Sequence, residues 1–233
     1  MRLLLVGRGR MGRLIESLAA SYGAEVAGIL DRASNPKGAG VTAERCRGID
    51  VAIDFSTAEA TLDTVPRLAE QGVSLVVGTT GWLAREAELR DAVAKAGVGA
   101  VVAANFSLGA NVLDALSESA GRLLAGVESY GAFIHEAHHQ AKKDAPSGTA
   151  LALKRAVERG GFPRAIDVSS TRAGFIPGTH TVGFDAQAET LELRHTVRDR
   201  ATFAHGALAA ARWVRGRKGW FTMRDVLGLT VTG

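Results

Sequence analysis

The residues best suited to do chemistry lie in one segment, HEAHHQAKKDAPSGT, which spans positions 135–149. Three of the chain's six histidines, His135, His138 and His139, fall in five consecutive positions there, and Lys142 follows His138 by four residues. A histidine exchanges protons near neutral pH, and a lysine ammonium stabilises negative charge that develops during a reaction. The segment therefore predicts a site at which an anionic group is held and receives a proton.

The end of the same segment predicts the mouth of a helix. The run DAPSG indicates a turn at residues 144–148, and a helix is expected over residues 149–159. Free backbone N–H groups at a helix N-terminus, together with the positive end of the helix dipole, form a site for an anion. The turn amides and Lys142 therefore suit a small acidic substrate.

The same letters also fit a different chemistry. His135, Glu136 and His139 read as H-E-x-x-H, the signature of zinc metallopeptidases. That chemistry requires both histidines on one face of a helix, and a third ligand. Because a strand-like run precedes the segment and a turn soon follows it, a helix there would be short. A zinc metallopeptidase stays as an alternative function, and the primary interpretation predicts no metal site.

The elements that must position such a site begin with a glycine loop. A buried strand is predicted at residues 2–6 and a helix at residues 13–22. Between them lies a G-x-G-x-x-G loop, made of Gly7, Arg8, Gly9, Arg10, Met11 and Gly12. In this order the glycines allow a tight turn and let a pyrophosphate approach the helix N-terminus. This half of the chain is predicted to bind a dinucleotide. A non-catalytic NAD-binding sensor is therefore a second alternative, although it would have no need for Lys142.

The second predicted strand, residues 25–30, ends in the pair Asp31 and Arg32. Asp31 follows Gly12 by 19 residues, near the spacing of the carboxylate that binds a ribose 2′-hydroxyl. An acid there favours NAD, whereas an adjacent arginine can accept the 2′-phosphate of NADP. The expected cofactors are therefore NADH and/or NADPH.

Alternating strands and helices up to residue 107 predict an α/β fold with a Rossmann-like, doubly wound parallel sheet. Further strands are expected at residues 51–55, 74–77 and 99–103, with helices at residues 58–71 and 83–96. Ligands gather at the carboxyl ends of such strands. The loop residues there that we expect to line the cofactor site are Gly78, Thr79, Thr80, Ala103, Ala104, Asn105 and Phe106.

The remainder predicts a second, α+β domain with an open sheet. A helix is expected at residues 108–124, and strands at residues 126–134, 166–171, 180–184, 190–197 and 201–203. The uncovered edges and faces of such a sheet favour oligomerisation. A helix at residues 206–215 and a closing segment at residues 220–229 are expected to return to the first domain. The predicted domains are residues 1–107 with 206–233, for the dinucleotide, and residues 108–205, for substrate binding and oligomerisation.

Composition narrows the class of protein. The 233 residues are 46% hydrophobic with a formal net charge of +4, which is ordinary for a globular chain. This mild basicity is too weak to predict nucleic acid as a partner. No apolar run is long enough to cross a bilayer, so no membrane partner is expected. Cys46 is the only cysteine, so no internal disulfide can form, and this fits a reducing cytoplasm.

A series of motifs runs along nearly the whole chain: GRGRMGR, IDFST, VVGTTG, AANFSLGAN, EAHHQAKKDAPSGTA, TRAGFIPGTHTVGF, TFAHGALAAARW and MRDVLGL. Together they resemble the dihydrodipicolinate reductases, also called 4-hydroxy-tetrahydrodipicolinate reductases. The chain departs from the family pattern in two places. Phe133 stands where the family usually has an acidic residue, and the chain is short after Asp31 and around residues 169–172.

The resemblance implies a function in lysine and diaminopimelate biosynthesis. The expected reaction is the NAD(P)H-dependent reduction of 4-hydroxy-tetrahydrodipicolinate, through its dehydrated cyclic imine, to tetrahydrodipicolinate. His138 and Lys142 are implied as the catalytic proton donors. The substrate's carboxylates would be held by His139, Lys142, Ser147, Gly148 and Thr149. The family also implies a cytoplasmic homotetramer assembled through the sheets of the second domain.

Overall fold

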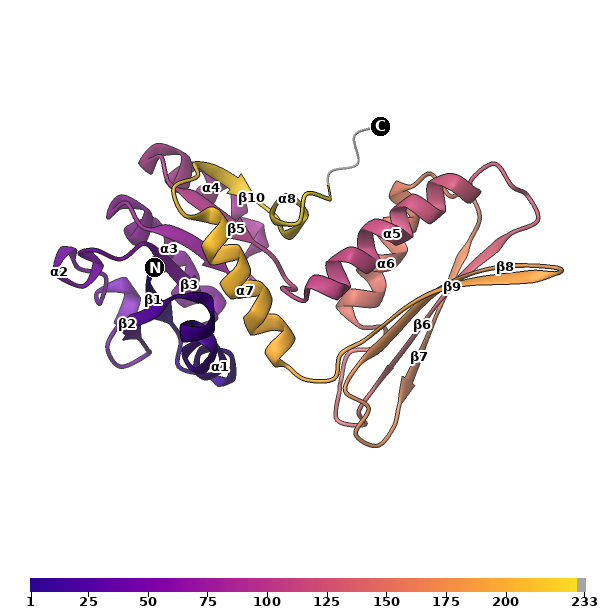
Figure 1. Ribbon diagram of the computed structural model, residues 1–233, viewed down its shortest axis with the longest axis horizontal. Helices are drawn as coiled ribbons and strands as arrows, with labels where there is room; N and C mark the ends of the chain where they lie inside the picture. The colour runs from indigo at the N-terminus through magenta and orange to yellow at the C-terminus, as the bar shows by residue number, and fades with distance from the viewer. Residues whose placement is uncertain (230–233) are drawn as a thin grey trace. The chain divides into compact units, whose positions relative to one another are not determined.

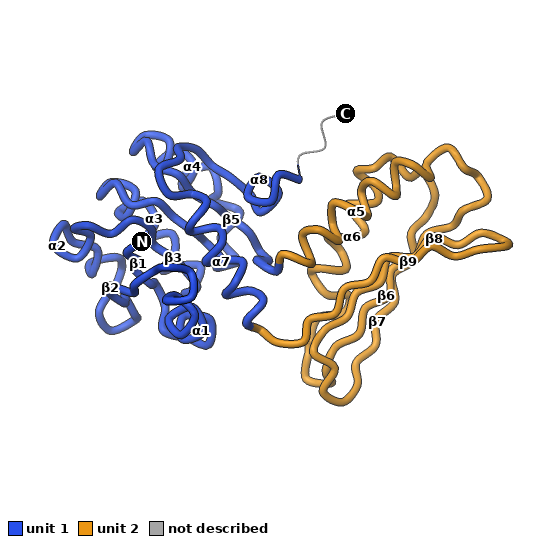
Figure 2. Tube along the Cα trace, in the orientation of Figure 1, with its two compact units in different colours: residues 1–107, 201–233 blue, residues 108–200 orange. Residues whose placement is uncertain are grey.

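The computed structural model describes residues 1–229, and the chain divides into two compact units (Figure 2). Unit 1 comprises Met1–Ser107 and the segment that starts at Ala201, and unit 2 comprises Leu108–Arg200. Unit 2 is thus inserted between two parts of unit 1. The return to unit 1 begins at Ala201 rather than at Gly206, because a helix starts there.

Unit 1 is built on a six-stranded parallel sheet with the order β10-β5-β4-β3-β1-β2 (Figure 1). The strands are β1 (Arg2–Val6), β2 (Glu25–Leu30), β3 (Val51–Asp54), β4 (Ser74–Val77), β5 (Gly99–Val102) and β10 (Gly219–Phe221). The strands predicted within residues 1–107 are confirmed to within one residue, and so is the doubly wound sheet. The sequence did not predict β10, which pairs with the edge of β5.

Helices pack on this sheet in pairs, α1 beside α7 and α3 beside α4. The helices of unit 1 are α1 (Arg10–Leu18), α2 (Ala43–Cys46), α3 (Ala58–Glu70), α4 (Glu86–Ala96), α7 (Ala201–Val214) and α8 (Met223–Val226). Three short 3-10 turns join them: η1 (Ala19–Tyr22), η2 (Pro36–Gly38) and η3 (Leu83–Arg85). The buried core is aliphatic, and Val65 and Leu68 of α3 pack there against Leu75 and Val77 of β4.

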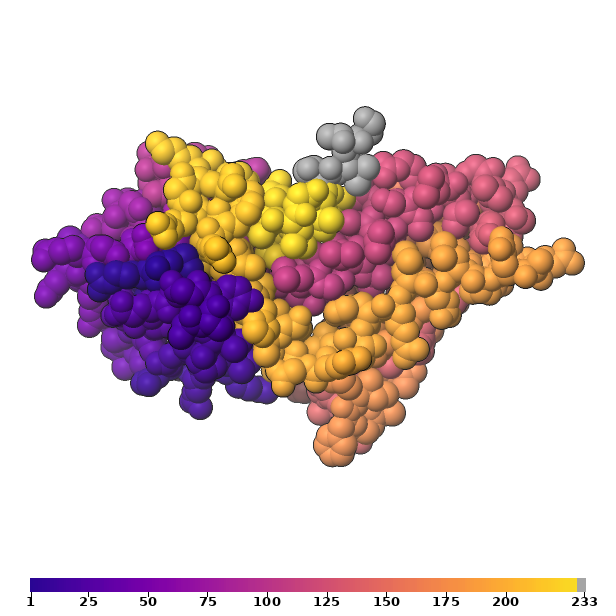
Figure 3. Space-filling view, in the orientation of Figure 1, coloured from indigo at the N-terminus to yellow at the C-terminus, as the bar shows by residue number. Residues whose placement is uncertain are grey.

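The segment that starts at Ala201 belongs to unit 1. In the space-filling view its yellow atoms lie against the indigo N-terminal segment (Figure 3). One predicted strand is wrong: Ala201–Phe203 forms the first turn of α7. Thr202 and Phe203 alone favour a strand, but the alanine-rich run behind them forms a helix. Extending an existing helix by one turn needs no new nucleation.

Unit 2 is a four-stranded mixed sheet with the order β7-β6-β8-β9. Its strands are β6 (Gly131–His138), β7 (Ile166–Arg172), β8 (Thr179–Ala186) and β9 (Glu189–Thr196), and its helices are α5 (Leu108–Leu124) and α6 (Gly148–Arg159). The two helices pack side by side along one face of the sheet (Figure 1). The open sheet is therefore confirmed. β6 starts later than predicted and runs through the histidine segment, because β7 and β8 both pair with it there.

The face of the sheet under the helices is apolar at one end and polar at the other. Ile134, Val182 and Phe184 are buried against Leu153 and Val157 of α6. Side chains alternate along a strand, so the same face continues beyond the helical cover with polar residues. In strand order these are Ser170 and Arg172 on β7, Glu136 and His138 on β6, His180 on β8, and His195 on β9. Within residues 1–229, no helix is long and apolar enough to cross a membrane.

Candidate active site

The polar end of unit 2 is centred on a carboxylate that has no exposure to solvent. Glu136 is 0% exposed. Arg172 reaches it from β7 with both ends of its guanidinium, Nη2 to Oε1 at 2.6 Å and Nη1 to Oε2 at 3.0 Å. The backbone N–H of Ser147 donates to Oε1 at 3.2 Å, and Nδ1 of His138 hydrogen-bonds Oε2. Glu136 therefore joins the predicted proton donor to the turn before α6.

Glu136 stays ionised in this position. Burial alone raises its pKa, but the hydrogen bonds from Arg172, Ser170 and His138 outweigh burial and lower the pKa to about 2. An ionised carboxylate accepts hydrogen bonds and donates none. The ring nitrogen of His138 that faces it must therefore carry a hydrogen.

His138 is held between this carboxylate and a second imidazole. The rings of His138 and His180 lie edge to face, with centroids 5.1 Å apart and planes at 71°. On the edge of the His138 ring that carries Nε2 lies Gly178, where an added Cβ would stand 3.1 Å from Nε2. Burial lowers the pKa of His138, and the charges of Lys142 and Arg172 lower it further, while Glu136 raises it. The net direction is downward from the ordinary value of 6.5.

His180 connects the histidine pair to the helix. Its Nε2 lies 3.1 Å from Oγ of Ser147, and its Nδ1 is buried without a partner in the described chain. Burial and the charge of His138 lower the pKa of His180 to about 4. His180 is therefore a neutral ring at physiological pH, and its contact with Ser147 is a hydrogen bond rather than an ion pair.

The N-terminus of α6 lies beside these residues, as the sequence predicted. Ser147 caps the helix, since its Oγ accepts from the N–H of Ala150 at 3.2 Å. Gly148 is exposed, and an added Cβ would meet no atom within 4 Å. Thr149 follows in the first turn. The positive end of the helix dipole lies here and favours an anion, and a hydrogen bond from the Gly148 backbone already helps to lower the pKa of the Asp144 carboxylate.

Lys142 and His139 lie on the loop between β6 and α6, before the predicted turn. The Nζ of Lys142 donates to Asp144 at 2.7 and 3.0 Å, and its charge is close enough to lower the pKa of His138. The carbonyl of His139 accepts the N–H of Lys142 at 3.1 Å, which closes a turn between them. Asp144 also ties the loop to β7, because its carbonyl accepts from Arg172 at 2.6 Å.

The structure does not support the zinc-peptidase alternative. The segment from His135 to His138 is strand β6, not a helix, so His135 faces away from Glu136 and His138. His135 instead hydrogen-bonds Oγ of Ser169 at 2.9 Å. A different set, Glu136, His138 and His180, has possible ligand atoms within 4.8 Å of one another. Both oxygens of that glutamate already face the Arg172 cation, which opposes a metal ion there.

In unit 1 the glycine loop opens onto a cavity of 820 Å³ at the carboxyl ends of β1, β2 and β3. This is where the strand order reverses, the usual ligand site of such sheets. Five of the predicted cofactor residues line it: Gly7, Arg8, Gly9, Asp31 and Arg32. The backbone there leaves no room for side chains. A Cβ at Gly12 would stand 2.2 Å from the carbonyl oxygen of Gly7, and one at Gly7 would stand 2.6 Å from that of Phe55.

Helix α1 starts at Arg10, earlier than predicted, so Arg10, Met11 and Gly12 form its first turn. Its N-cap is Gly9, which makes no side-chain capping bond, so the first N–H groups of the helix face the loop. A pyrophosphate fits this arrangement, because small residues admit it and free amides bind it.

Asp31 is held rigidly at the end of β2. Its Oδ1 accepts from the N–H groups of Ala33 and Ser34 and from the hydroxyl of Ser34, at 3.1, 2.9 and 2.8 Å. The hydrogen bonds from Ser34 hold the pKa of Asp31 below its usual value. These bonds all use Oδ1, so none of them occupies Oδ2.

The remaining predicted cofactor residues follow β4 and β5 and do not line this cavity. Gly78 lies under the ring of Phe55, where an added Cβ would stand 2.2 Å from the ring. Phe106 is buried in contact with Phe55 and belongs to the core. The members of this set are Gly78, Thr79, Thr80, Ala103, Ala104, Asn105 and Phe106, and they share the carboxyl edge of the sheet with the cavity.

A buried carboxylate that the sequence reasoning missed joins these loops. Asp54 is 1% exposed and accepts from the N–H of Ser56 at 2.8 Å, from Thr61 at 2.8 Å and from Thr79 at 3.1 Å. Burial raises its pKa, and these hydrogen bonds oppose the rise. Asp54 thus fixes the loop after β3 to the loop after β4.

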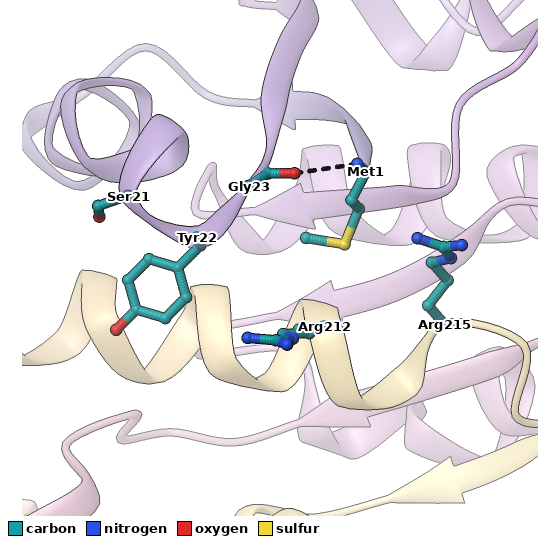
Figure 4. A pocket seen from close by; sticks show the side chains of 6 residues that line it. All are labelled: Met1, Ser21, Tyr22, Gly23, Arg212 and Arg215. Atoms are coloured by element: carbon teal, nitrogen blue, oxygen red, sulfur yellow. Dashed lines mark hydrogen bonds between the residues drawn. The ribbon is translucent and has the colours of Figure 1, made fainter.

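A second hollow, of 570 Å³, lies at the opposite, amino-terminal edge of the same sheet (Figure 4). Its lining residues are Met1, Ser21, Tyr22, Gly23, Arg212 and Arg215. The N-terminal amine bonds the carbonyl of Gly23 at 3.1 Å. Arg212 and Arg215 stand at the C-terminal end of α7, where cations complement the helix dipole. This hollow is therefore not the predicted dinucleotide site.

Sequence reasoning also missed Glu136, Arg172 and His180 as members of the site. One signal existed for His180, which alternates with Val182 and Phe184 and so had to share their inward face. Arg172 gave no such signal, because its contact with Glu136 depends on the register of β6 with β7.

Comparisons with known proteins agree with both halves of this arrangement. The family model "Dihydrodipicolinate reductase, N-terminus" matches residues 1–106, and "Dihydrodipicolinate reductase, C-terminus" matches residues 109–227. A 4-hydroxy-tetrahydrodipicolinate reductase from Methanoregula boonei is 38% identical, and the alignment covers 96% of each chain. A protein of the same name from Thiobacillus denitrificans is 39% identical, over 95% of this chain and 96% of that one.

A solved structure has the same fold. The dipicolinate-bound dihydrodipicolinate reductase from Paenisporosarcina sp. TG-14 has a TM-score of 0.78 at 21% identity, over 97% of this chain and 98% of its own. A diaminopimelate dehydrogenase from C. glutamicum has a TM-score of 0.62 at 14% identity, over 100% of this chain and 96% of its own. At these identities the likeness concerns the fold alone.

Proposed function

The chain belongs to the dihydrodipicolinate reductase family, and from this premise we propose how its own residues carry out the reduction. It is an NAD(P)-dependent oxidoreductase of lysine and diaminopimelate biosynthesis, and it reduces 4-hydroxy-tetrahydrodipicolinate, through its cyclic imine, to tetrahydrodipicolinate. The observation that carries the residue assignments is the site in unit 2. There an ionised Glu136 holds His138 beside the N-terminus of α6.

Unit 1 holds the cofactor. Gly7–Gly12 would bind the pyrophosphate, with Arg8 and Arg10 near the phosphates, and Asp31 and Arg32 would bind the adenine ribose. The loops after β4 and β5, at Gly78–Thr80 and Ala103–Phe106, would line the nicotinamide end. When bound, the reduced nicotinamide supplies a hydride. The cavity, the uncapped helix and the oriented Asp31 carboxylate support this assignment.

Unit 2 holds the substrate, which carries two carboxylates. Gly148, Thr149 and the Ser147 hydroxyl would bind one of them at the helix N-terminus, where N–H groups and the dipole favour an anion. His139 and Lys142 would hold the other. Lys142 pairs with Asp144 in the structure, so binding would exchange one carboxylate partner for another.

His138 is the proton donor in this proposal. Once the ring has accepted a hydride, it needs a proton, and the imidazolium of His138 supplies it from Nε2. Lys142 stabilises the electron density that builds up on the ring during hydride arrival, because a fixed cation in a shielded site acts strongly.

The same proposal covers assembly and location. The face of the unit 2 sheet opposite α5 and α6 bears Phe133, which covers Gly183, and no helix of the described chain packs on it. This supports a homotetramer formed through the sheets. The proposed location is the cytoplasm, which a single free cysteine, Cys46, and a biosynthetic reaction support.

The test is an assay of nicotinamide oxidation with freshly generated substrate and with each cofactor in turn. The wild-type chain should turn over. Lys142→Met should lower kcat by roughly 10²-fold or more, because a group fixed where charge develops contributes about 3–4 kcal/mol to a transition state, while NADH binding stays unchanged.

Lys143→Met is the matched control, since Lys143 is the exposed neighbour of Lys142. It should leave the rate near that of the wild type. A Lys142→Met variant as active as this control would remove Lys142 from the mechanism. A wild-type chain that binds NADH but oxidises it with neither cofactor would overturn the proposed activity.

A further inference from the structure

We propose that Glu136 is a positioning residue for the reduction, which acts through His138. It fixes one hydrogen on Nδ1 and so leaves Nε2 as the only ring nitrogen that delivers a proton to the substrate. This inference rests on the proposed function, because it specifies how the proton donor of that reaction is held.

The carboxylate is immobilised from two sides. Arg172 on β7 binds both oxygens, at 2.6 and 3.0 Å, and the N–H of Ser147 binds Oε1 from the start of α6 at 3.2 Å. Arg172 is itself fixed by the carbonyls of Thr171 and Asp144, at 2.8 and 2.6 Å. A paired, forked contact of this kind sets orientation as well as distance. Oε2 is therefore held toward the imidazole.

This geometry decides the tautomer of His138. Glu136 is ionised and can only accept, so a neutral His138 ring must carry its hydrogen on Nδ1. Turning the ring over would place Nε2 against the carboxylate and remove it from the side of Gly178. A carboxylate that orients a histidine in this way keeps one nitrogen constantly ready for proton exchange.

The proton transfer balances without a change at Glu136. The Nε2–H bond of the imidazolium breaks, and its proton goes to the reduced ring of the substrate. The electron pair stays on Nε2, which leaves the neutral Nδ1–H tautomer. Solvent then returns a proton to Nε2, and Glu136 remains a carboxylate throughout.

Several charged or titratable groups face His138 from the surrounding elements. Glu136 lies on its own strand, Arg172 on β7 and His180 on β8, and the loop before α6 contributes Lys142, which Asp144 pairs. Glu136 favours the imidazolium, whereas Arg172 and Lys142 oppose it. Removing Glu136 and removing Arg172 must therefore change the proton affinity of His138 in opposite directions.

The first measurement needs no substrate. Nitrogen NMR of histidine-labelled protein distinguishes protonated from unprotonated ring nitrogens. Above its pKa, His138 of the wild type should carry its hydrogen on Nδ1. Glu136→Gln should lose this preference, because an amide can donate as well as accept. A wild-type ring protonated on Nε2 would overturn the inference, whatever the enzyme's activity.

The second measurement is the pH dependence of turnover. Glu136→Gln should lower kcat by roughly 10²-fold, the contribution of a general acid, with a smaller change in KM. The pH above which its rate falls should move downward. Arg172→Met should move that pH upward, and Arg172→Lys, which keeps the charge, should leave it in place. Shifts in the same direction for Glu136→Gln and Arg172→Met would contradict the inference.

Two controls separate positioning from folding. Glu158→Gln removes an exposed carboxylate from α6 and should leave rate and pH profile unchanged. Should Glu136→Gln fail to fold with its arginine unpaired, the double variant Glu136→Gln with Arg172→Met removes both charges. It should still lose the Nδ1–H preference. An inactive wild type would count against the proposed function, whereas an active wild type with an unaffected Glu136→Gln variant would count against this inference alone.

Discussion

At the scale of single residues, the site depends on pairs of side chains whose environments separate their roles. Glu136 is buried and yet strongly acidic, because Arg172 and two further hydrogen-bond donors outweigh its burial. His138 and His180 lie edge to face, but of the two His138 alone hydrogen-bonds the Glu136 carboxylate in the described structure. The two histidines are thereby made different, which suits the proposed role of His138 as proton donor and leaves His180 as a neutral hydrogen-bonding ring.

The lowered pKa of His138 predicts a pH dependence. A general acid is active in its protonated form, so its contribution is present below its pKa and lost as the pH rises through it. We expect kcat/KM to fall with rising pH, and the fall should begin at a pH below 6.5, the ordinary pKa of histidine. The bound dianion should raise the pKa of His138, so kcat should persist to higher pH. Rate profiles across the neutral range would check this, and a kcat/KM that rises with pH would contradict it.

The rigid placement of Asp31 predicts a change in cofactor preference. Asp31→Asn should weaken NADH binding by roughly 10-fold, because a hydrogen bond to a charged group contributes about 1.5–3 kcal/mol. The affinity for NADPH should fall less, since the substitution also removes a negative charge that repels the 2′-phosphate. Dissociation constants from titration of each cofactor would measure this.

Asp63→Asn is the comparison variant, because Asp63 is a carboxylate that lines the same cavity. It should change both affinities about equally. An equal loss of NADH and NADPH in Asp31→Asn would show that Asp31 is not a ribose ligand.

At the scale of elements, the N-cap of helix α6 has two roles: it caps the helix and it contacts the candidate site. Ser147 closes the helix through Ala150 and also contacts His180. Ser147→Ala should lower the free energy of unfolding by about 1 kcal/mol. It should also raise KM for the substrate, and the fold-change in kcat should be smaller than the fold-change in KM. Thr42, the N-cap of α2, hydrogen-bonds Arg45 at 3.3 Å and offers a matched loss of a cap.

Thr42→Ala should lower the free energy of unfolding but leave KM unchanged. Thermal unfolding and steady-state kinetics on both variants separate the two roles. If both variants left KM unaltered, Ser147 would be a helix cap and nothing more.

Element prediction succeeded where local pattern and tertiary pairing agree. The aliphatic runs of β1 to β5 are strands for both reasons, since they are apolar and pair within one parallel sheet. It failed where they disagree. His135–His138 is too polar to predict a strand, yet β7 and β8 pair with it on both sides. Ala201–Phe203 suits a strand, yet it joins the helix behind it.

The site was predictable in part for the same reason. The EAHHQAKKDAPSGTA segment is local, so the sequence alone predicts a site that contains His138, Lys142 and the α6 turn. Arg172 and His180 reach the site from other strands, and only the sheet register brings them to Glu136. Local spacing carries no information about that register.

At the scale of the whole molecule, the exposed sheet face of unit 2 predicts assembly. Phe133 stands where the family usually has an acidic residue, and it covers the backbone of Gly183. The wild type should sediment as a tetramer. Phe133→Ala should shift it toward smaller species, because it removes the apolar ring that this face offers for burial.

Leu123→Ala is the control for this change, since Leu123 lies on α5 and is 78% exposed. It should leave the tetramer intact. A wild-type monomer at micromolar concentration would contradict the proposed assembly.

The inserted position of unit 2 has a consequence for how the chain is made on the ribosome. β5 ends before unit 2 begins, and β10, which pairs with it, follows unit 2. The edge of β5 therefore stays unpaired while the whole of unit 2 is synthesised. Open strand edges of this kind recruit other chains during synthesis. The nascent protein should thus be most prone to aggregation after α5 has emerged and before β10 is synthesised. The length of this interval depends on the order of the segments along the chain and not on the stability of the folded protein.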